Sequence, residues 1–213
     1  MANREFEDKY IKLGNKYICG LDEAGRGPLA GPLVVACVIL PNDYNNDDIN
    51  DSKKLSAKKR QELFNEIIDK CIEYTITIYD NNEVDKLNPY KASQLGMSEC
   101  VRKLKTNIDI VLTDAMPLPS INKPVIDIIK GDAKSISIAA ASILAKVTRD
   151  NMMVEYDKEY PQYDFKSNKG YGTKKHIDAI YKYGITPIHR KSYEPIKTIL
   201  NPPLKFDFDE DEK

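Results

Sequence analysis

Three short apolar segments of this chain each end in acidic residues, and this pattern restricts the fold more than any other feature. The segments cover residues 18–23, 108–114 and 125–132. Short apolar runs of this kind are typical of β-strands, and in α/β proteins ligands bind at the carboxyl ends of the strands. We therefore expect an α/β fold in which one rim of a sheet gathers several carboxylates.

The acids in these segments have the chemistry of a metal site. Carboxylates held close together repel one another unless a divalent cation lies between them. Magnesium takes oxygen ligands and keeps part of its water shell, and two such ions about 3.5–4 Å apart can cleave a phosphodiester. Asp127 lies in the middle of its segment and is a weaker candidate, and two histidines are too few to favour zinc. The candidate ligands are Asp22, Glu23, Asp114 and Asp132.

A glycine-rich motif, Gly25-Arg26-Gly27, follows the first acid pair directly. Exposed glycine amides can approach a phosphate or a sugar hydroxyl without obstruction by a side chain, and an arginine can pair with phosphate. A tight structural turn would use the same glycines. Taken alone, the motif leaves both interpretations open.

Composition excludes several other classes of protein. The chain has 213 residues, of which 41% are apolar and 31% charged, as expected for a globular protein with its own core. Its longest apolar stretch, residues 29–40, contains Gly31 and Pro32 and is too short to span a bilayer. The charged N-terminus has no signal-like segment, and four scattered cysteines predict core residues in a reducing compartment. We expect a cytoplasmic monomer without a membrane partner.

The order of the predicted elements gives the domain organisation. Strands are predicted at residues 17–21, 32–40, 74–79, 108–113 and 125–129, and helices at 56–68, 88–104, 138–150, 174–183 and 194–200. Strands come first, then mixed units, then helices alone. This order predicts an α/β core over residues 1–150, a helical region over 151–200 and an acidic, disordered tail over 201–213.

The helical region is strongly basic although the whole chain has a net charge of −1. Residues 166–191 contain seven lysines and arginines and one acid, together with Tyr171, Tyr181 and Tyr183. Basic side chains interleaved with aromatic rings suit a nucleic-acid backbone and its sugars or bases. A solvated, lysine-rich helix face has the same composition.

Four motifs resemble those of ribonuclease HII, in the family's order and spacing between about residues 17 and 195. They are residues 22–32, 51–56, 130–147, and 170–176 together with 189–193. The related ribonuclease HIII has an extra N-terminal domain and a different sequence after the acid pair, so the resemblance is to the HII form. It implies an RNase H-like mixed sheet flanked by helices, with a C-terminal helical appendage, and cleavage of RNA within or paired with DNA.

By matching position, the resemblance also implies roles for single residues. The four acids would bind metal, and the glycine motif would contact the ribose 2′-hydroxyl, which distinguishes RNA from DNA, and the adjacent phosphate. Tyr171 would stack on the following deoxyribose, and His176 in the same motif would support the site rather than catalyse. The family often has proline where Gly172 stands. Residues expected to touch phosphate are Lys53, Lys54 and Lys146.

We therefore expect an endoribonuclease that uses Mg²⁺ or Mn²⁺ and cuts 5′ to a ribonucleotide, in RNA/DNA hybrids and in duplex DNA containing ribonucleotides. A related nuclease acting on DNA alone and a non-catalytic hybrid-binding module are the alternatives. The tail contains Phe206 and Phe208, as a sliding-clamp peptide would. It lacks the usual glutamine and paired aromatics, which favours a flexible end without clamp binding.

Overall fold

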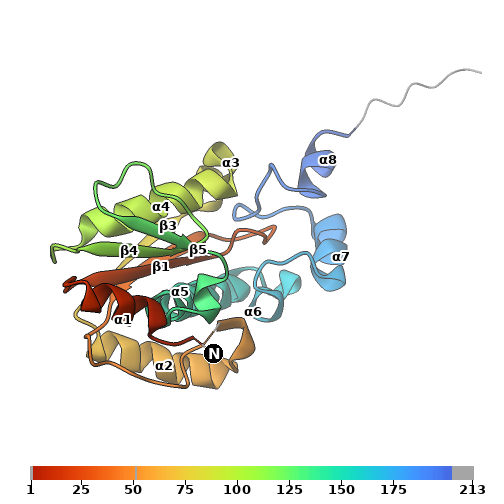
Figure 1. Ribbon diagram of the computed structural model, residues 1–213. Helices are drawn as coiled ribbons and strands as arrows, with labels where there is room; N and C mark the ends of the chain where they lie inside the picture. The colour runs from red at the N-terminus through yellow and green to blue at the C-terminus, as the bar shows by residue number, and fades with distance from the viewer. Residues whose placement is uncertain (1, 51, 203–213) are drawn as a thin grey trace, which may run out of the picture.

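The computed structural model describes residues 2–50 and 52–202, and its centre is a five-stranded mixed sheet (Figure 1). The strand order is β3-β2-β1-β4-β5. Strand β2 is antiparallel to both of its neighbours, β1 and β3, whereas β4 and β5 are parallel to β1. The predicted α/β class is confirmed. Residues 203–213, which make up most of the predicted tail and include its two phenylalanines, lie outside the described part. The strands are β1 (Ile18–Ala24), β2 (Leu33–Ile39), β3 (Glu73–Tyr79), β4 (Ile110–Asp114) and β5 (Val125–Ile128).

Several helices begin where their capping residues predict. The side chains of Ser56 and Asn88 accept hydrogen bonds from the first turns of α2 and α4. Three helices, α1, α3 and α6, were not predicted, although α3 begins with a capping box of Asp80 and Glu83. Within the described residues, no helix is both long and apolar enough to cross a membrane. The helices are α1 (Glu5–Lys12), α2 (Ala57–Lys70), α3 (Asn81–Leu87), α4 (Pro89–Lys103), α5 (Ile136–Glu159), α6 (Phe165–Asn168), α7 (Lys174–Tyr183) and α8 (Ile196–Leu200), with 3-10 turns η1 (Ser52–Lys54), η2 (Gly131–Ala133) and η3 (Pro161–Tyr163).

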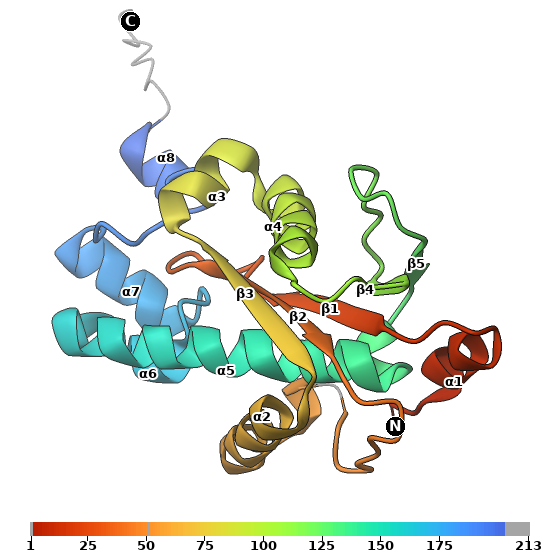
Figure 2. The same ribbon diagram turned by 90° about the vertical axis from the view of Figure 1, so that its left-hand side faces the viewer.

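Helices cover both faces of the sheet. Figure 2 shows α2 and α5 below it and α3 and α4 above it. Successive side chains of a strand point to opposite faces, so β2 contributes to both cores. Val34 and Val38 pack in the core with α2 and α5, whereas Val35 and Cys37 pack in the core with α4. Both faces of β2 are therefore buried, which explains its unbroken apolar sequence.

Helix α5 lies unusually close to β1 because of a glycine. A Cβ atom at Gly20 would lie 2.2 Å from the carbonyl carbon of Ser137 and 2.5 Å from the backbone nitrogen of Ile138. The small residues of α5 pack in the core below the sheet. This close packing places the side of α5 next to the carboxylate end of β1.

The elements after α5 pack against the loop between β1 and β2. Leu29 and Ala30 of this loop share a core with Tyr163 and Phe165, and Ala30 forms a bridge with His189. The predicted boundary at residue 150 falls inside α5, which contacts both the sheet and α6. The core and the C-terminal helical region thus share one continuous helix.

Candidate functional site

Three of the four predicted acids converge at one rim of the sheet. Oxygen atoms of Asp22, Asp114 and Asp132 all lie within 4.8 Å of one another. Strands β1 and β4 are parallel neighbours, with Leu21 opposite Thr113, so the residues that follow, Asp22 and Asp114, lie side by side. The backbone N–H of Gly131 donates to Asp114 Oδ1 at 2.7 Å and ties η2, which carries Asp132, to the end of β4.

The donor set fits a divalent cation. Oxygen ligands lie about 2.0–2.6 Å from such an ion, so ligand atoms on opposite sides of it are about 4–5 Å apart. Asp22 is buried, and burial together with the nearby charges of Glu23 and Asp114 raises its pKa well above the usual range. The backbone N–H of Glu23 donates to Asp22 Oδ1 at 2.7 Å, which lowers the pKa of this carboxyl in part, as does the hydroxyl of Ser142 on α5. A buried group of like charges of this kind is stabilised by a bound cation.

The fourth acid, Glu23, lies beside this group but outside it. The prediction that the acid pair follows the strand is wrong, because β1 continues to Ala24, with Glu23 paired opposite Val35 of β2. Adjacent side chains of a strand point to opposite faces, so Glu23 turns away from Asp22. It forms an ion pair with Arg26 at 3.4 Å. The pKa of Glu23 is raised, mainly by burial. The charge of Arg26 opposes this rise and the charge of Asp114 adds to it, so Glu23 still interacts electrostatically with the cluster.

A pocket of about 460 Å³ opens next to the cluster, and it is lined by Asp22 of the cluster and by the adjacent Glu23. Most of the residues predicted to bind substrate line this pocket. Lys54 is not among them, and its side chain lies outside the described part of the structure. The predicted residues in the pocket wall are Gly25, Arg26, Gly27, Lys53, Lys146 and Tyr171.

The loop between β1 and β2, which carries the Gly25-Arg26-Gly27 motif and is called the glycine loop below, is held in place by two buried arginines. Neither arginine was predicted from the sequence. Arg149 on α5 donates to the carbonyls of Ala30 and Pro32, at 3.1 and 2.9 Å. Arg190 donates to the carbonyls of Gly25 and Gly31, at 2.6 and 2.9 Å. Burial lowers the pKa of both guanidinium groups, that of Arg149 to about 10. Arg149 lies in the predicted helix at 138–150 and Arg190 in the motif at 189–193, but nothing in the local sequence of either segment indicates burial.

At Gly25 the loop and Arg149 leave no room for a side chain. The φ angle of Gly25 is +105°, and a Cβ atom would lie 2.3 Å from Arg149 Nε and 2.6 Å from the carbonyl oxygen of Pro32. The glycine is therefore required by the geometry of the loop as well as by any ligand. At Gly27, by contrast, a Cβ atom would make only an ordinary van der Waals contact, 3.7 Å from a ring carbon of Tyr171.

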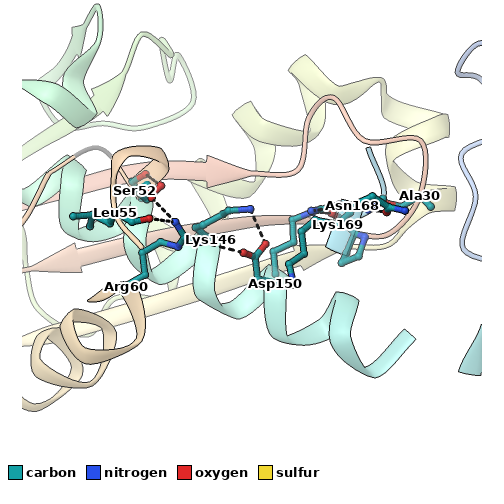
Figure 3. Close-up of polar contacts among 12 residues, drawn as sticks. Ala30, Ser52, Leu55, Arg60, Lys146, Asp150, Asn168 and Lys169 are labelled. Carbon is teal, nitrogen blue, oxygen red and sulfur yellow. Dashed lines mark hydrogen bonds and ion pairs between the residues drawn. The ribbon is translucent and has the colours of Figure 1, made fainter. Parts of the chain in front are cut away.

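On the opposite wall a charged network joins α2, α5 and η1. Lys146 donates to Asp150 Oδ1 at 2.7 Å, and Arg60 lies 3.8 Å from the other oxygen of Asp150 (Figure 3). Arg60 also donates to the carbonyl of Ser52 at 2.9 Å. Ser52 Oγ lies 2.9 Å from Ser142 Oγ, so the network reaches a serine that lines the same pocket as Asp22. Arg60 and Asp150 were not predicted as site residues.

A model of the family described as Ribonuclease HII matches residues 19–196. The chain belongs to the ribonuclease HII family. The chain is 55% identical to the ribonuclease HII of Mycoplasma mycoides over 202 residues, which cover 93% of this chain and 98% of that protein. It is 53% identical to the ribonuclease HII of Clostridioides difficile over 195 residues, covering 92% of this chain and 76% of that protein.

Solved structures of the family share the fold. Ribonuclease H2 from Pyrococcus horikoshii matches with a TM-score of 0.71 and 25% identity, over 86% of this chain and 96% of that one. Ribonuclease HII from Archaeoglobus fulgidus, solved in complex with PCNA, matches with a TM-score of 0.67 and 26% identity, over 84% of this chain and 95% of that one. Family membership makes this chain an endonuclease of the ribonuclease H type, which acts on RNA/DNA substrates and uses divalent metal ions.

Proposed function

We propose that this enzyme cuts the RNA strand of RNA/DNA hybrids and also cuts 5′ to single ribonucleotides embedded in duplex DNA. The observation that carries the proposal is the continuity of the acidic cluster with the pocket. Asp22 belongs to both, and the glycine loop and Tyr171 lie in the same pocket wall. A phosphate held at the cluster would therefore have its sugars next to groups that can distinguish ribose from deoxyribose.

The metal site in this proposal is formed by Asp22, Glu23, Asp114 and Asp132, with Mg²⁺ or Mn²⁺ as the ion. When bound, a pair of these ions supplies activated water and neutralises the charge on the leaving oxygen. The three clustered aspartates provide most of the ligand atoms. Glu23 lines the pocket beside Asp22, which suits a ligand that serves a second ion. Cleavage in this manner leaves 3′-hydroxyl and 5′-phosphate ends.

Recognition of the ribonucleotide is assigned to the glycine loop and Tyr171. Backbone groups of Gly25 and Gly27 can hydrogen-bond a 2′-hydroxyl, since the side chains that would obstruct it are absent. Arg26 is half-exposed and pairs only weakly with Glu23, at 3.4 Å, so a phosphate can compete for its guanidinium group. Tyr171 is 46% exposed, and its ring can stack on the flat face of a deoxyribose.

Phosphate contacts farther along the duplex are assigned to the basic residues around the pocket. Lys53 and Lys146 line it, and Lys54 neighbours Lys53 in the chain. The region 151–200 contributes α7, on which Tyr181 and Tyr183 are exposed beside several lysines. Exposed lysines and aromatic rings on one helix suit the backbone of a nucleic acid.

A matched pair of substrates tests the proposal. One is a DNA duplex with a single ribonucleotide, and the other is the same duplex of DNA alone. We expect cleavage of the first only, 5′ to the ribonucleotide, lost with a chelator and restored separately by Mg²⁺ and by Mn²⁺. Equal cutting of both would indicate a DNA nuclease, and binding without cutting in any metal would indicate a hybrid-binding module.

We further propose that the enzyme acts as a monomer in the cytoplasm, without clamp binding through its tail. A single chain supplies both the acidic cluster and the pocket wall. The free cysteines Cys19, Cys37 and Cys100 are buried, which fits a reducing compartment. Light scattering during size-exclusion chromatography tests the monomer, with a 24.2 kDa species expected.

A further inference from the structure

Two fully buried histidines outside the acidic cluster are hydrogen-bonded to each other. The Nε2 atoms of His176 on α7 and His189 lie 3.0 Å apart, and neither residue is exposed to solvent. The rings of Tyr163 and Phe165 enclose the pair, with ring centroids between 5.2 and 6.3 Å from those of the histidines. Two polar rings in such an apolar enclosure are stable only if their nitrogens are hydrogen-bonded.

The outer partners of the pair determine where its protons lie. His176 Nδ1 lies 2.8 Å from the carbonyl oxygen of Tyr171, which can only accept, so this nitrogen carries a hydrogen. His189 Nδ1 lies 2.8 Å from the backbone nitrogen of Thr186, which can only donate, so this nitrogen is bare. For two neutral rings, His189 Nε2–H must then donate to His176 Nε2. Every ring nitrogen is satisfied in this one arrangement.

Burial keeps both rings neutral near pH 7. It lowers the pKa of His176, and burial together with the neighbouring His176 lowers the pKa of His189 to about 4. The pair is therefore a fixed chain of hydrogen bonds from Thr186 to Tyr171. An apolar residue at either position would leave the Thr186 N–H or the Tyr171 carbonyl without this partner.

The segment that carries His189 also holds the glycine loop. The backbone N–H of Arg190 donates to the carbonyl of Leu29 at 2.8 Å, and its side chain donates to the carbonyl of Gly25 at 2.6 Å. His189 itself is bridged to Ala30. Residues 186–190 thus contact the glycine loop on one side and, through the histidines, Tyr171 on the other.

We propose that His176 and His189 are positioning residues for recognition of the ribonucleotide, which hold Tyr171 at a set distance from the glycine loop. Neither histidine belongs to the acidic cluster or lines the pocket, so the pair acts through the backbone of Tyr171 on one side and that of the glycine loop on the other. This inference rests on the proposed function, in which Tyr171 and the glycine loop contact the two sugars of an RNA–DNA junction. Its effect should appear in recognition of the junction and not in the chemical step.

Two nearly isosteric substitutions of His176 separate this role from simple filling of the core. In His176→Asn the amide nitrogen occupies the place of Nδ1 and can still donate to the Tyr171 carbonyl, although contact with His189 is lost. In His176→Gln the amide reaches toward His189, but the donor to Tyr171 is lost. Both variants lose similar packing, and thermal unfolding verifies that both are folded.

Steady-state kinetics are measured on the embedded-ribonucleotide duplex and on a continuous RNA/DNA hybrid. For His176→Gln we expect a rise in KM of about fivefold to tenfold on the embedded substrate, the equivalent of one lost hydrogen bond, with kcat nearly unchanged and a smaller effect on the hybrid. His176→Asn should lie closer to the unsubstituted enzyme. Equal effects of the two substitutions on both substrates would overturn the proposal and indicate a structural role only.

Nitrogen-15 NMR of the histidine rings tests the geometry independently of activity. We expect His176 protonated at Nδ1 and His189 at Nε2, and a shift of the Tyr171 ring signals in His176→Gln that is absent in His176→Asn. The opposite tautomers, or Tyr171 signals that respond equally to both, would overturn the positioning role. Tyr171→Ala is the reference for the proposed function: if it leaves the substrate preference unchanged, the sugar-reading role of Tyr171 fails, and the NMR result alone then decides whether the histidines position this residue.

Discussion

Replacing Asp114 by asparagine should make the metal-free protein more stable while abolishing its activity. Asparagine keeps an oxygen in the place of Oδ1, so the hydrogen bond from the Gly131 N–H, 2.7 Å long in the structure, can persist. The substitution removes one of three carboxylate charges whose oxygens lie within 4.8 Å of one another. Without a cation these charges repel, and with a cation they are needed to bind it.

The magnitude follows from the geometry. Two unit charges 4.8 Å apart, at an effective dielectric constant of about 20, repel by about 3.5 kcal/mol. Part of this repulsion is already relieved, because the raised pKa of Asp22 allows that carboxyl to hold a proton. We therefore expect Asp114→Asn to increase the free energy of unfolding by about 1–3 kcal/mol without metal, which corresponds to a rise in Tm of about 2–10 °C for a domain of this size.

Thermal unfolding in EDTA and in rising concentrations of Mg²⁺ measures both effects. At a Mg²⁺ concentration about ten times its Kd, the unsubstituted enzyme should gain about 1.4 kcal/mol, whereas Asp114→Asn should gain much less. Cleavage of a hybrid should be lost, while binding of the hybrid is largely retained. The matched control is Asp127→Asn, which removes an exposed acid on β5 outside the cluster and should change neither quantity.

Two results would refute this reasoning. A Tm in EDTA that falls in Asp114→Asn as much as in an ordinary core substitution would show that the three charges do not repel appreciably. Retained cleavage, or an undiminished response to Mg²⁺, would show that Asp114 is not a ligand. Either result would remove the basis for the metal site at this rim of the sheet.

The remaining predictions concern packing and pH. Gly20→Ala should destabilise the protein by about 3 kcal/mol or more, because the new Cβ would lie 2.2 Å from backbone atoms of α5, whereas Gly27→Ala, with its nearest neighbour 3.7 Å away, should leave the urea midpoint unchanged. Equal midpoints would contradict the close approach of α5. The pKa of His189 is lowered from 6.5 to about 4. Between these pH values the residue is therefore protonated in the unfolded chain and neutral in the folded chain. Its contribution to stability is complete above pH 6.5 and is lost as the pH falls toward 4, by a total on the order of 3 kcal/mol. Urea unfolding across this range measures the loss, and His189→Gln should show a correspondingly shallower dependence on pH.

Local sequence patterns predicted the elements whose determinants lie within a few residues. The caps Ser56 and Asn88 begin α2 and α4 as expected, and α7 spans the predicted residues. Buried free cysteines and the apolar strand β2 also agree with the prediction. Capping residues and hydrophobic periodicity act over one or two helical turns, so a short stretch of sequence is enough to recognise them.

The α/β class and the three acids of the cluster were also accessible from the sequence. Apolar runs that end in acids predicted Asp22, Asp114 and Asp132 at one rim, and the structure brings these three together. The motifs of the ribonuclease HII family supplied the full set of residues predicted to bind substrate, most of which line the pocket.

The tertiary structure alone decided those features that depend on contacts between residues far apart in the chain. Glu23 is separated from the cluster because β2 extends β1 past the expected end, and this pairing is absent from the local sequence of β1. The buried Arg149 and Arg190 bond to carbonyls more than a hundred residues away, and the contact of His176 with His189 joins α7 to a separate segment. Hydrogen bonds between distant segments depend on the packing of the whole chain. The local sequence therefore tells which groups a residue can bond, but not which partner it finds in the fold.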